Sequence, residues 1–245
     1  MHYSTKEQKV WIFGDSYFQS PILDNPLVSQ NSWTAFIEKF YKTKNFAQGG
    51  TGLDWSLQQL IINTKKKDTK DDILIFGLGS HYRFNLKFIK EPKYQANYSL
   101  DRYKFFSKGK WGIKKYKQDS SIKNISANFL KQFIFEYVLH STYDTTEFDK
   151  VVSYLYFFTK KRFKKVLLFP IFQKFSFNLP KDSKVYMPNF CMADIEFKKI
   201  EQEVDPRANH MSDENNIIFY NTINNWIQNN ILPDKSLFST YEERQ

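Results

Sequence analysis

Short apolar segments that alternate with helical patterns constrain the fold of this chain more than any other feature. Apolar residues run without interruption through 10–13, 73–76 and 166–169, as is typical of strands buried in a parallel sheet. A shorter segment at 44–47 predicts one further strand. Helical spacing of apolar residues predicts helices in the intervening and flanking segments, at 33–40, 53–65, 126–139, 146–162 and 213–229. In the last of these we expect Ile217, Tyr220, Ile223 and Ile227 or Trp226 to face the core. This alternation predicts an α/β fold, a three-layer α/β/α sandwich around a mostly parallel sheet.

The length of 245 residues predicts a single domain spanning residues 1–245. Segment 85–125 interrupts the alternation, because Lys and Arg outnumber Asp and Glu in it and Tyr, Phe and Trp lie between them. We interpret this segment as an insertion or lid over the carboxyl end of the sheet. A hydrophobic content of 41% excludes global disorder. The single cysteine, Cys191, excludes an internal disulfide and a cysteine-based zinc site.

The formal charge of +10 favours anionic partners such as nucleic acid, acidic glycans or a membrane surface. A general preference for Lys in the composition would give the same charge without any partner. The first seven residues lack the apolar core of a signal peptide, and no apolar stretch is long enough to span a membrane. We therefore expect a soluble, by default cytoplasmic protein, with incorporation into a virus particle as the alternative.

The first predicted strand ends in the turn Gly14-Asp15-Ser16. A sharp bend at that point would leave the serine hydroxyl exposed, although Gly-Asp-Ser is also ordinary turn chemistry. Two more glycine-bearing turns follow the second and third strands, at 48–52 and 77–81. Because the carboxyl ends of parallel strands meet at one edge, we expect the three turns to lie together, where ligands of such sheets bind.

These turns resemble the sequence blocks of the SGNH hydrolase superfamily, the GDSL-like esterases and lipases. Phe13-Gly14-Asp15-Ser16 is similar to the block that carries the nucleophilic serine, and 45–50 is similar to the second block, whose glycine would be Gly50. His210, just before the last predicted helix, matches the position of the family's catalytic histidine. Two departures stand out. His81 occupies the place of the usual Asn, and Arg207 stands where the usual Asp lies, so that the nearest upstream carboxylate is Asp205.

The resemblance implies a serine esterase without metal or organic cofactor, acting on a small-molecule or polysaccharide ester, such as an O-acyl group on a carbohydrate. Ser16 would attack the acyl carbon, His210 would take its proton and Asp205 would orient the histidine. The N–H groups of Ser16 and Gly50 would bind the oxyanion, together with His81 if its ring presents an N–H.

Other interpretations of these residues stay open. His210 can simply precede the helix, Asp205 can be a solvated loop carboxylate, and His81 can be a surface residue. The chain can also be a catalytically weak or inactive SGNH-fold protein that serves as a structural or glycan-binding part of an assembly such as a virus particle. A third alternative is a nucleic-acid-binding module that uses the basic and aromatic residues of 87–117.

Overall fold

The computed structural model describes residues 8–20, 32–49, 51–79, 83–85, 99–101, 145–171, 179–180, 184–195 and 211–238. Its strands are β1 (Lys9–Phe13), β2 (Lys42–Asn45), β3 (Ile73–Leu78), β4 (Arg83–Asn85), β5 (Ser99–Asp101), β6 (Lys165–Pro170) and β7 (Val185–Tyr186). Its α-helices are α1 (Trp33–Phe40), α2 (Leu53–Thr64), α6 (Thr145–Thr159) and α7 (Asp213–Asn229). Two short 3₁₀ helices, η2 (Met192–Asp194) and η3 (Lys235–Leu237), complete the described elements.

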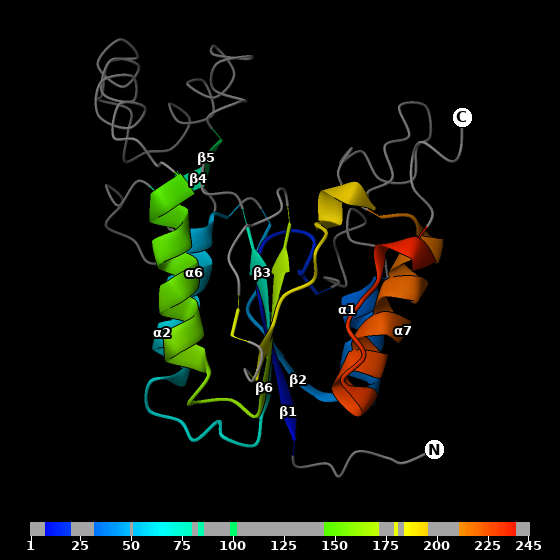
Figure 1. Cartoon of the computed structure of the whole chain (residues 1–245), viewed down its shortest axis with the longest axis horizontal. Helices are drawn as coiled ribbons and strands as arrows, with labels where there is room; N and C mark the ends of the chain where they lie inside the picture. The colour runs from blue at the N-terminus through cyan, green and yellow to red at the C-terminus, as the bar shows by residue number, and fades with distance from the viewer. Residues whose placement is uncertain are drawn as a thin grey trace, which may run out of the picture.

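Five of these strands form a fully parallel sheet in the order β2-β1-β3-β6-β7 (Figure 1). The central pairings place Ile12 opposite Ile75 and Ile75 opposite Leu167. The chain therefore starts in the middle of the sheet, moves to one edge with β2, and then crosses β1 to build the other half. This reversal makes the gap between the carboxyl ends of β1 and β3 the topological switch point, where ligands of open α/β sheets bind.

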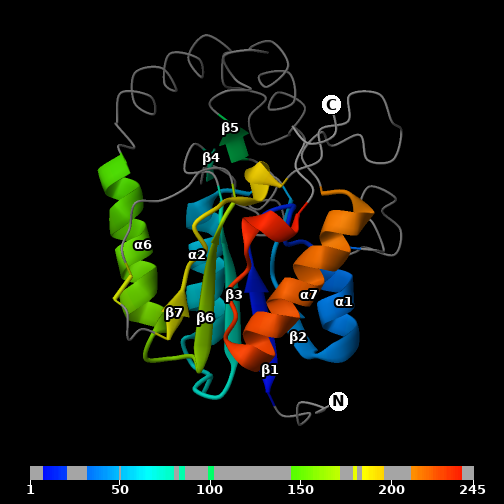
Figure 2. The same ribbon diagram turned by 45° about the vertical axis from the view of Figure 1, so that its right-hand side comes forward.

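Helices cover both faces of the sheet (Figures 1 and 2). Helices α1 and α7 pack on one face, and α2 and α6 lie on the other. The predicted three-layer α/β/α architecture is confirmed. Serine hydroxyls cap two of the helices, because Ser32 accepts a hydrogen bond from the N–H of Ala35 and Ser212 accepts one from the N–H of Asn215.

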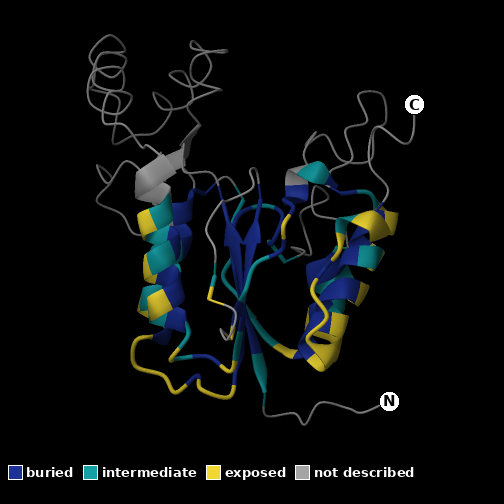
Figure 3. Ribbon diagram, in the orientation of Figure 1, coloured by how far each residue is buried: buried dark blue, intermediate teal, exposed yellow. Residues whose placement is uncertain are grey.

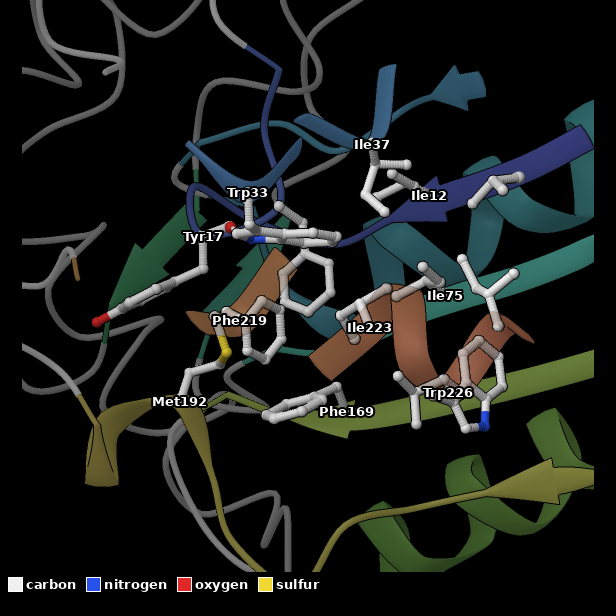
Figure 4. Close-up of a cluster of buried hydrophobic side chains, with 14 of the residues drawn as sticks. Ile12, Tyr17, Trp33, Ile37, Ile75, Phe169, Met192, Phe219, Ile223 and Trp226 are labelled. Atoms are coloured by element: carbon white, nitrogen blue, oxygen red, sulfur yellow. Dashed lines mark hydrogen bonds between the residues drawn. The ribbon is translucent and has the colours of Figure 1, made fainter. Parts of the chain in front are cut away.

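The core beneath α1 and α7 is a chain of aromatic rings (Figure 4). The ring of Trp33 meets that of Phe18 edge to face at a centroid distance of 5.2 Å. It meets the ring of Phe219 in the same way at 5.0 Å, as Figure 4 shows. The ring of Phe219 also contacts the ring of Phe169, at a centroid distance of 5.0 Å. Such contacts add about 0.5–1.5 kcal/mol each to the area buried, so α1, α7, β6 and the turn after β1 are held as one unit.

Several details differ from the sequence prediction. Helix α6 ends at Thr159, three residues before the predicted end, and strands β4 and β5 were not predicted. Strand β2 starts at Lys42 and ends at Asn45, two residues earlier than expected, because Phe46 and Ala47 belong to the turn that follows. Helix α7 turns Phe219 inward, whereas Ile217, expected in the core, is 46% exposed. The short edge strand β7 was not predicted, since two residues are too few to give a pattern.

Some predicted segments fall outside the described residues. The helix expected at 126–139 is one of them, and of the insertion at 85–125 the structure describes only Asn85 and β5. Strand β5 pairs antiparallel with β4. Among the described residues, no helix has the length and apolar character needed to cross a membrane.

Candidate active site at the carboxyl edge of the sheet

Ser16 lies in a tight turn directly after β1. The N–H of Phe18 donates to the backbone carbonyl of Asp15 over 3.0 Å, and the N–H of Tyr17 donates to the Asp15 side chain over 3.1 Å. Asp15, Tyr17 and Phe18 are buried, and Ser16 is the one residue of this turn that stays partly exposed. The turn is therefore fixed by its buried members, and Ser16 is its accessible side chain.

Phe18 explains the glycines that end β1 and β3. A β-carbon on Gly14 would lie 2.8 Å from Cγ of Phe18, and one on Gly77 would lie 2.8 Å from Cε2 of the same ring. Neither distance is compatible with a side chain at these positions. The two glycines thus let the Phe18 ring pack directly on the backbone at the switch point, which anchors the turn that carries Ser16.

The turn after β2 lies against Ser16. A β-carbon on Gly49 would lie 3.5 Å from Cβ of Ser16, so the two residues are neighbours. The N–H of Gly49 donates to the side-chain carbonyl of Gln19 over 2.9 Å, and the N–H of Gln48 donates to the Gly14 carbonyl over 3.1 Å. These contacts confirm that the first two glycine-bearing turns lie together.

Asn45, part of the second sequence block, connects the two turns. Its amide nitrogen donates to the Phe18 carbonyl over 2.8 Å, and its side-chain oxygen accepts from the N–H of Ala47 over 2.9 Å. The side chain therefore fixes the path of the chain into the Gly49 turn. Its role in the structure is positional.

Thr51 and Gly79 lie where the chain enters α2. The buried hydroxyl of Thr51 donates to the Gln48 carbonyl over 2.7 Å, with the Gly14 carbonyl at 3.5 Å. A β-carbon on Gly79 would lie 3.9 Å from the backbone nitrogen of Leu53, at the start of α2. Sequence reasoning missed Gln19 and Thr51, because a single polar residue beside a turn carries no pattern of its own.

The start of α7 is anchored to the same region. The side-chain oxygen of Asn216 accepts from the backbone N–H of Trp33 over 3.1 Å, and its nitrogen donates to the Met211 carbonyl over 3.2 Å. Trp33 in turn donates its indole N–H to the Tyr17 carbonyl over 2.8 Å (Figure 4 shows the two side chains). Asn215 donates to the carbonyl of Ile195 over 2.8 Å. Both described residues that flank segment 196–210, Ile195 and Met211, are therefore fixed at the start of α7.

Of the predicted site residues, the structure describes Ser16. Gly50, His81, Asp205 and His210 lie outside the described residues. Within the described ranges, no three or more His, Cys, Asp or Glu side chains are grouped so that they could hold a metal ion. Cys191 is buried, with its backbone N–H donating to the side chain of Asp194 over 3.1 Å.

No protein-family model matches this chain, and no curated protein is significantly similar to it.

Proposed function

We propose that this protein is a serine hydrolase of the SGNH type that cleaves carboxylic esters. The observation that carries the proposal is the partly exposed Ser16 on a hydrogen-bonded turn at the switch point of a parallel sheet. A serine nucleophile needs a fixed position with space for substrate and for a base, and this turn supplies the fixed position.

In the proposed reaction, Oγ of Ser16 attacks the acyl carbon while His210 takes the hydroxyl proton. The tetrahedral intermediate collapses to an acyl-enzyme when His210 returns that proton to the leaving alcohol, and water then releases the acid by the reverse sequence. Asp205 orients His210. The N–H groups of Ser16 and Gly50, with His81, bind the oxyanion; loss of one such donor typically costs about 10²–10³ in rate.

Two contacts of described residues support these roles. Gly49 packs against Ser16, which brings the chain just before Gly50 to the nucleophile. Met211, the residue after His210, is bound by Asn216, and Asn216 also binds Trp33, whose indole holds Tyr17. A short chain of hydrogen bonds thus connects the neighbour of the proposed base to the neighbour of the proposed nucleophile.

The substrate class that we propose is an O-acylated carbohydrate. Support comes from the sequence of segment 85–125, in which Tyr and Trp alternate with Lys. Aromatic faces stack on the apolar faces of sugar rings, and ammonium groups bind acidic substituents of glycans.

A fluorophosphonate probe tests the enzyme, because it labels activated serines. We expect mass spectrometry to locate the adduct on Ser16, and we expect the adduct to disappear in Ser16→Ala and His210→Ala. Ser20→Ala is the matched control, since Ser20 lies four residues further along and hydrogen-bonds Glu38, and it should keep full labelling. A folded protein without an adduct on Ser16 would overturn the proposal. Protein that has not been treated with the probe would then be assayed with acetylated sugars and with longer acyl esters.

A further inference from the structure

The amino edge of the sheet, opposite Ser16, carries a continuous surface built from two connections. Segment 65–72 leads from α2 to β3, and segment 160–164 leads from α6 to β6. The Thr69 hydroxyl donates to the Arg162 carbonyl over 2.7 Å, and the N–H of Lys164 donates to the Asp72 carbonyl over 2.9 Å. The guanidinium of Arg162 also donates to the Thr64 carbonyl. The two connections therefore form one fixed surface.

This surface is strongly basic. Its exposed cations are Lys65, Lys66, Lys67, Lys70, Lys161 and Lys164. The exposed carboxylates in the same two connections are those of Asp68 and Asp71, because Asp72 is buried and accepts hydrogen bonds from the indole of Trp11 and the N–H of Lys9. We call the six lysines, together with Ile62 and Phe157, the basic edge.

Large apolar side chains are exposed at the ends of the helices that lead into these connections, and the ammonium of Lys160 lies 4.7 Å from the ring of one of them, Phe157. Ile62 is 63% exposed and Phe157 is 62% exposed, each two residues before the end of its helix. On the other side of the sheet, Phe40 at the end of α1 is 61% exposed and Ile231, just after α7, is 56% exposed. Figure 3 shows exposed residues along the lower ends of the helices and in the connections there. Exposed apolar groups thus gather at the amino edge on both faces of the sheet.

Helix dipoles account for part of this arrangement. Lysines just after a helix end, such as Lys65 and Lys160, stabilise the partial negative charge of the last carbonyls. That effect falls off within one turn, so it does not explain Lys70 or Lys164. It gives no reason for Ile62 and Phe157 to face solvent.

We propose that the basic edge binds the surface of an anionic lipid membrane. Lysines next to protruding apolar side chains are the combination that binds membrane interfaces, because the ammonium groups attract acidic headgroups while the apolar groups enter the acyl boundary. The charge of the edge, six exposed lysines against two exposed carboxylates, is complementary to such a surface.

The same residues fit nucleic acid less well. The one arginine of the surface, Arg162, is half-buried, with its guanidinium 4.9 Å from the ring of Phe158 and bonded to the Thr64 carbonyl. It is therefore not presented for bidentate phosphate contacts. Ile62 has no ring on which a base could stack.

Binding through this edge would set the orientation of the protein. Strands β1, β3 and β6 run from the amino edge to the carboxyl edge, and five or six residues of strand span about 17–20 Å. Ser16 would face away from the membrane, toward water. The inference does not depend on the proposed hydrolase, since binding and hydrolysis use opposite edges of the sheet.

Co-sedimentation of the full chain with vesicles tests the inference. We expect binding to vesicles of phosphatidylcholine with a large fraction of phosphatidylserine, and little binding to phosphatidylcholine alone. The double variant Lys65→Glu/Lys66→Glu should lower the partition coefficient by at least about 25-fold, because each of the two cations that are removed contributes about fivefold and the two added carboxylates oppose binding further. Lys67 is left unchanged because its ammonium lies 5.3 Å from the ring of Trp11.

Matched controls show whether a change in vesicle binding comes from the basic edge itself or from net charge and overall hydrophobicity. Lys150→Glu/Lys235→Glu makes the same change in charge outside the amino edge, in α6 and η3, and should bind nearly as well as the unchanged chain. Ile62→Ser/Phe157→Ser should lower partitioning at least about tenfold. Leu237→Ser should not, although Leu237 is 55% exposed. Equal losses in edge and control variants would overturn the inference.

Two further outcomes would also overturn it. One is the absence of sedimentation with anionic vesicles at low salt. The other is salt-sensitive binding to a labelled DNA or RNA duplex that Lys65→Glu/Lys66→Glu abolishes while vesicles are not bound, which would make the edge a nucleic-acid surface. Circular dichroism melting checks that each variant is folded, and fluorophosphonate labelling of Ser16 in the edge variants reports on the hydrolase separately.

Discussion

The indole N–H of Trp33 donates a hydrogen bond of 2.8 Å to the backbone carbonyl of Tyr17, which joins the first residue of α1 to the residue after Ser16. Trp33 is completely buried. Trp33→Phe should therefore lose ring volume and also leave a carbonyl without its partner, at a combined cost of about 2–4 kcal/mol in the free energy of unfolding. Urea unfolding measures this cost, and the rate of fluorophosphonate labelling should fall with it.

Trp226→Phe is the matched control for that variant. Trp226 is equally buried, but its indole nitrogen has no hydrogen-bond partner within the described part of the chain. This variant should lose ring volume alone, so it should be less destabilised than Trp33→Phe by about 1–3 kcal/mol and should keep the labelling rate of Ser16. Equal destabilisation and equal labelling of the two variants would contradict a positional role for the Trp33 indole.

Gly77, the next-to-last residue of β3, offers a second test of the turn that carries Ser16. Gly77→Ala would place a β-carbon 2.8 Å from the Phe18 ring and from Cδ1 of Ile171, so it should destabilise the fold by about 1–3 kcal/mol. Gly79→Ala meets its nearest atom at 3.9 Å and should change stability by less than about 0.5 kcal/mol. Thermal unfolding compares the two.

A double-mutant cycle shows whether contact with Phe18 causes the destabilisation by Gly77→Ala. Adding Phe18→Leu to Gly77→Ala should recover part of the loss, because the smaller side chain can move away from the added methyl group. If the two substitutions changed the free energy of unfolding additively, the close packing of Phe18 on Gly77 would be contradicted.

The layered fold was predictable because its signals are local. Continuous apolar runs over β1, β3 and β6 and helical spacing over α7 give strand and helix assignments directly, and α7 was predicted with the bounds that the structure shows. The prediction of the inward face of α7 was wrong at Ile217, because Ile217, Phe219 and Tyr220 are all apolar and their spacing fits more than one face. Packing against Trp33 and Phe169 selects Phe219.

The polar contacts of the site were not predictable in the same way. Ser16 follows from its position after an apolar run. Gln19, in contrast, acts through a hydrogen bond to Gly49, 30 positions away, and Thr51 lies 3.5 Å from the carbonyl of Gly14, 37 positions away. Such contacts depend on the sheet bringing β1 and β2 together, and nothing in the local sequence marks them. The roles of Gly50, His81, Asp205 and His210 stay predictions.

Tyr41 makes stability depend on pH at the alkaline end. Its hydroxyl donates to Asn224 and accepts from Gln228 over 2.9 Å, and burial raises its pKa above the ordinary value of 10.0. Above pH 10 the unfolded chain loses this proton while the folded chain keeps it, so stability should fall as pH rises through the folded pKa. Tyr41→Phe should be less stable than the unchanged chain at pH 8, and the difference should shrink above pH 10.

Urea midpoints at several pH values between 8 and 11 measure this effect. Burial also raises the pKa of Tyr220, so Tyr220→Phe should show a dependence of the same sign. A difference between Tyr41→Phe and the unchanged chain that stays constant across this range would contradict the prediction.

Gln19 offers a test of the charge that develops beside Ser16 in the proposed reaction. Its side-chain oxygen accepts from the N–H of Gly49, and Gly49 packs on Ser16. Gln19→Glu keeps an acceptor for this N–H but adds a negative charge near the nucleophile, because the Gln19 side-chain oxygen and Cβ of Ser16 lie 2.8 and 3.5 Å from the same point, the position of a β-carbon on Gly49. Gln19→Ala removes the acceptor without adding charge.

The two substitutions should therefore rank in a defined order. Gln19→Glu should lower kcat/KM for ester hydrolysis by about 10–100-fold, because the carboxylate opposes the developing oxyanion. Gln19→Ala should lower it by about tenfold or less, because the Gly49 turn loses one hydrogen bond, worth about 1 kcal/mol. Melting temperatures show whether both variants keep the fold. A Gln19→Glu variant that hydrolyses esters faster than Gln19→Ala would show that no negative charge builds up next to Gln19, and the oxyanion would then have to form elsewhere.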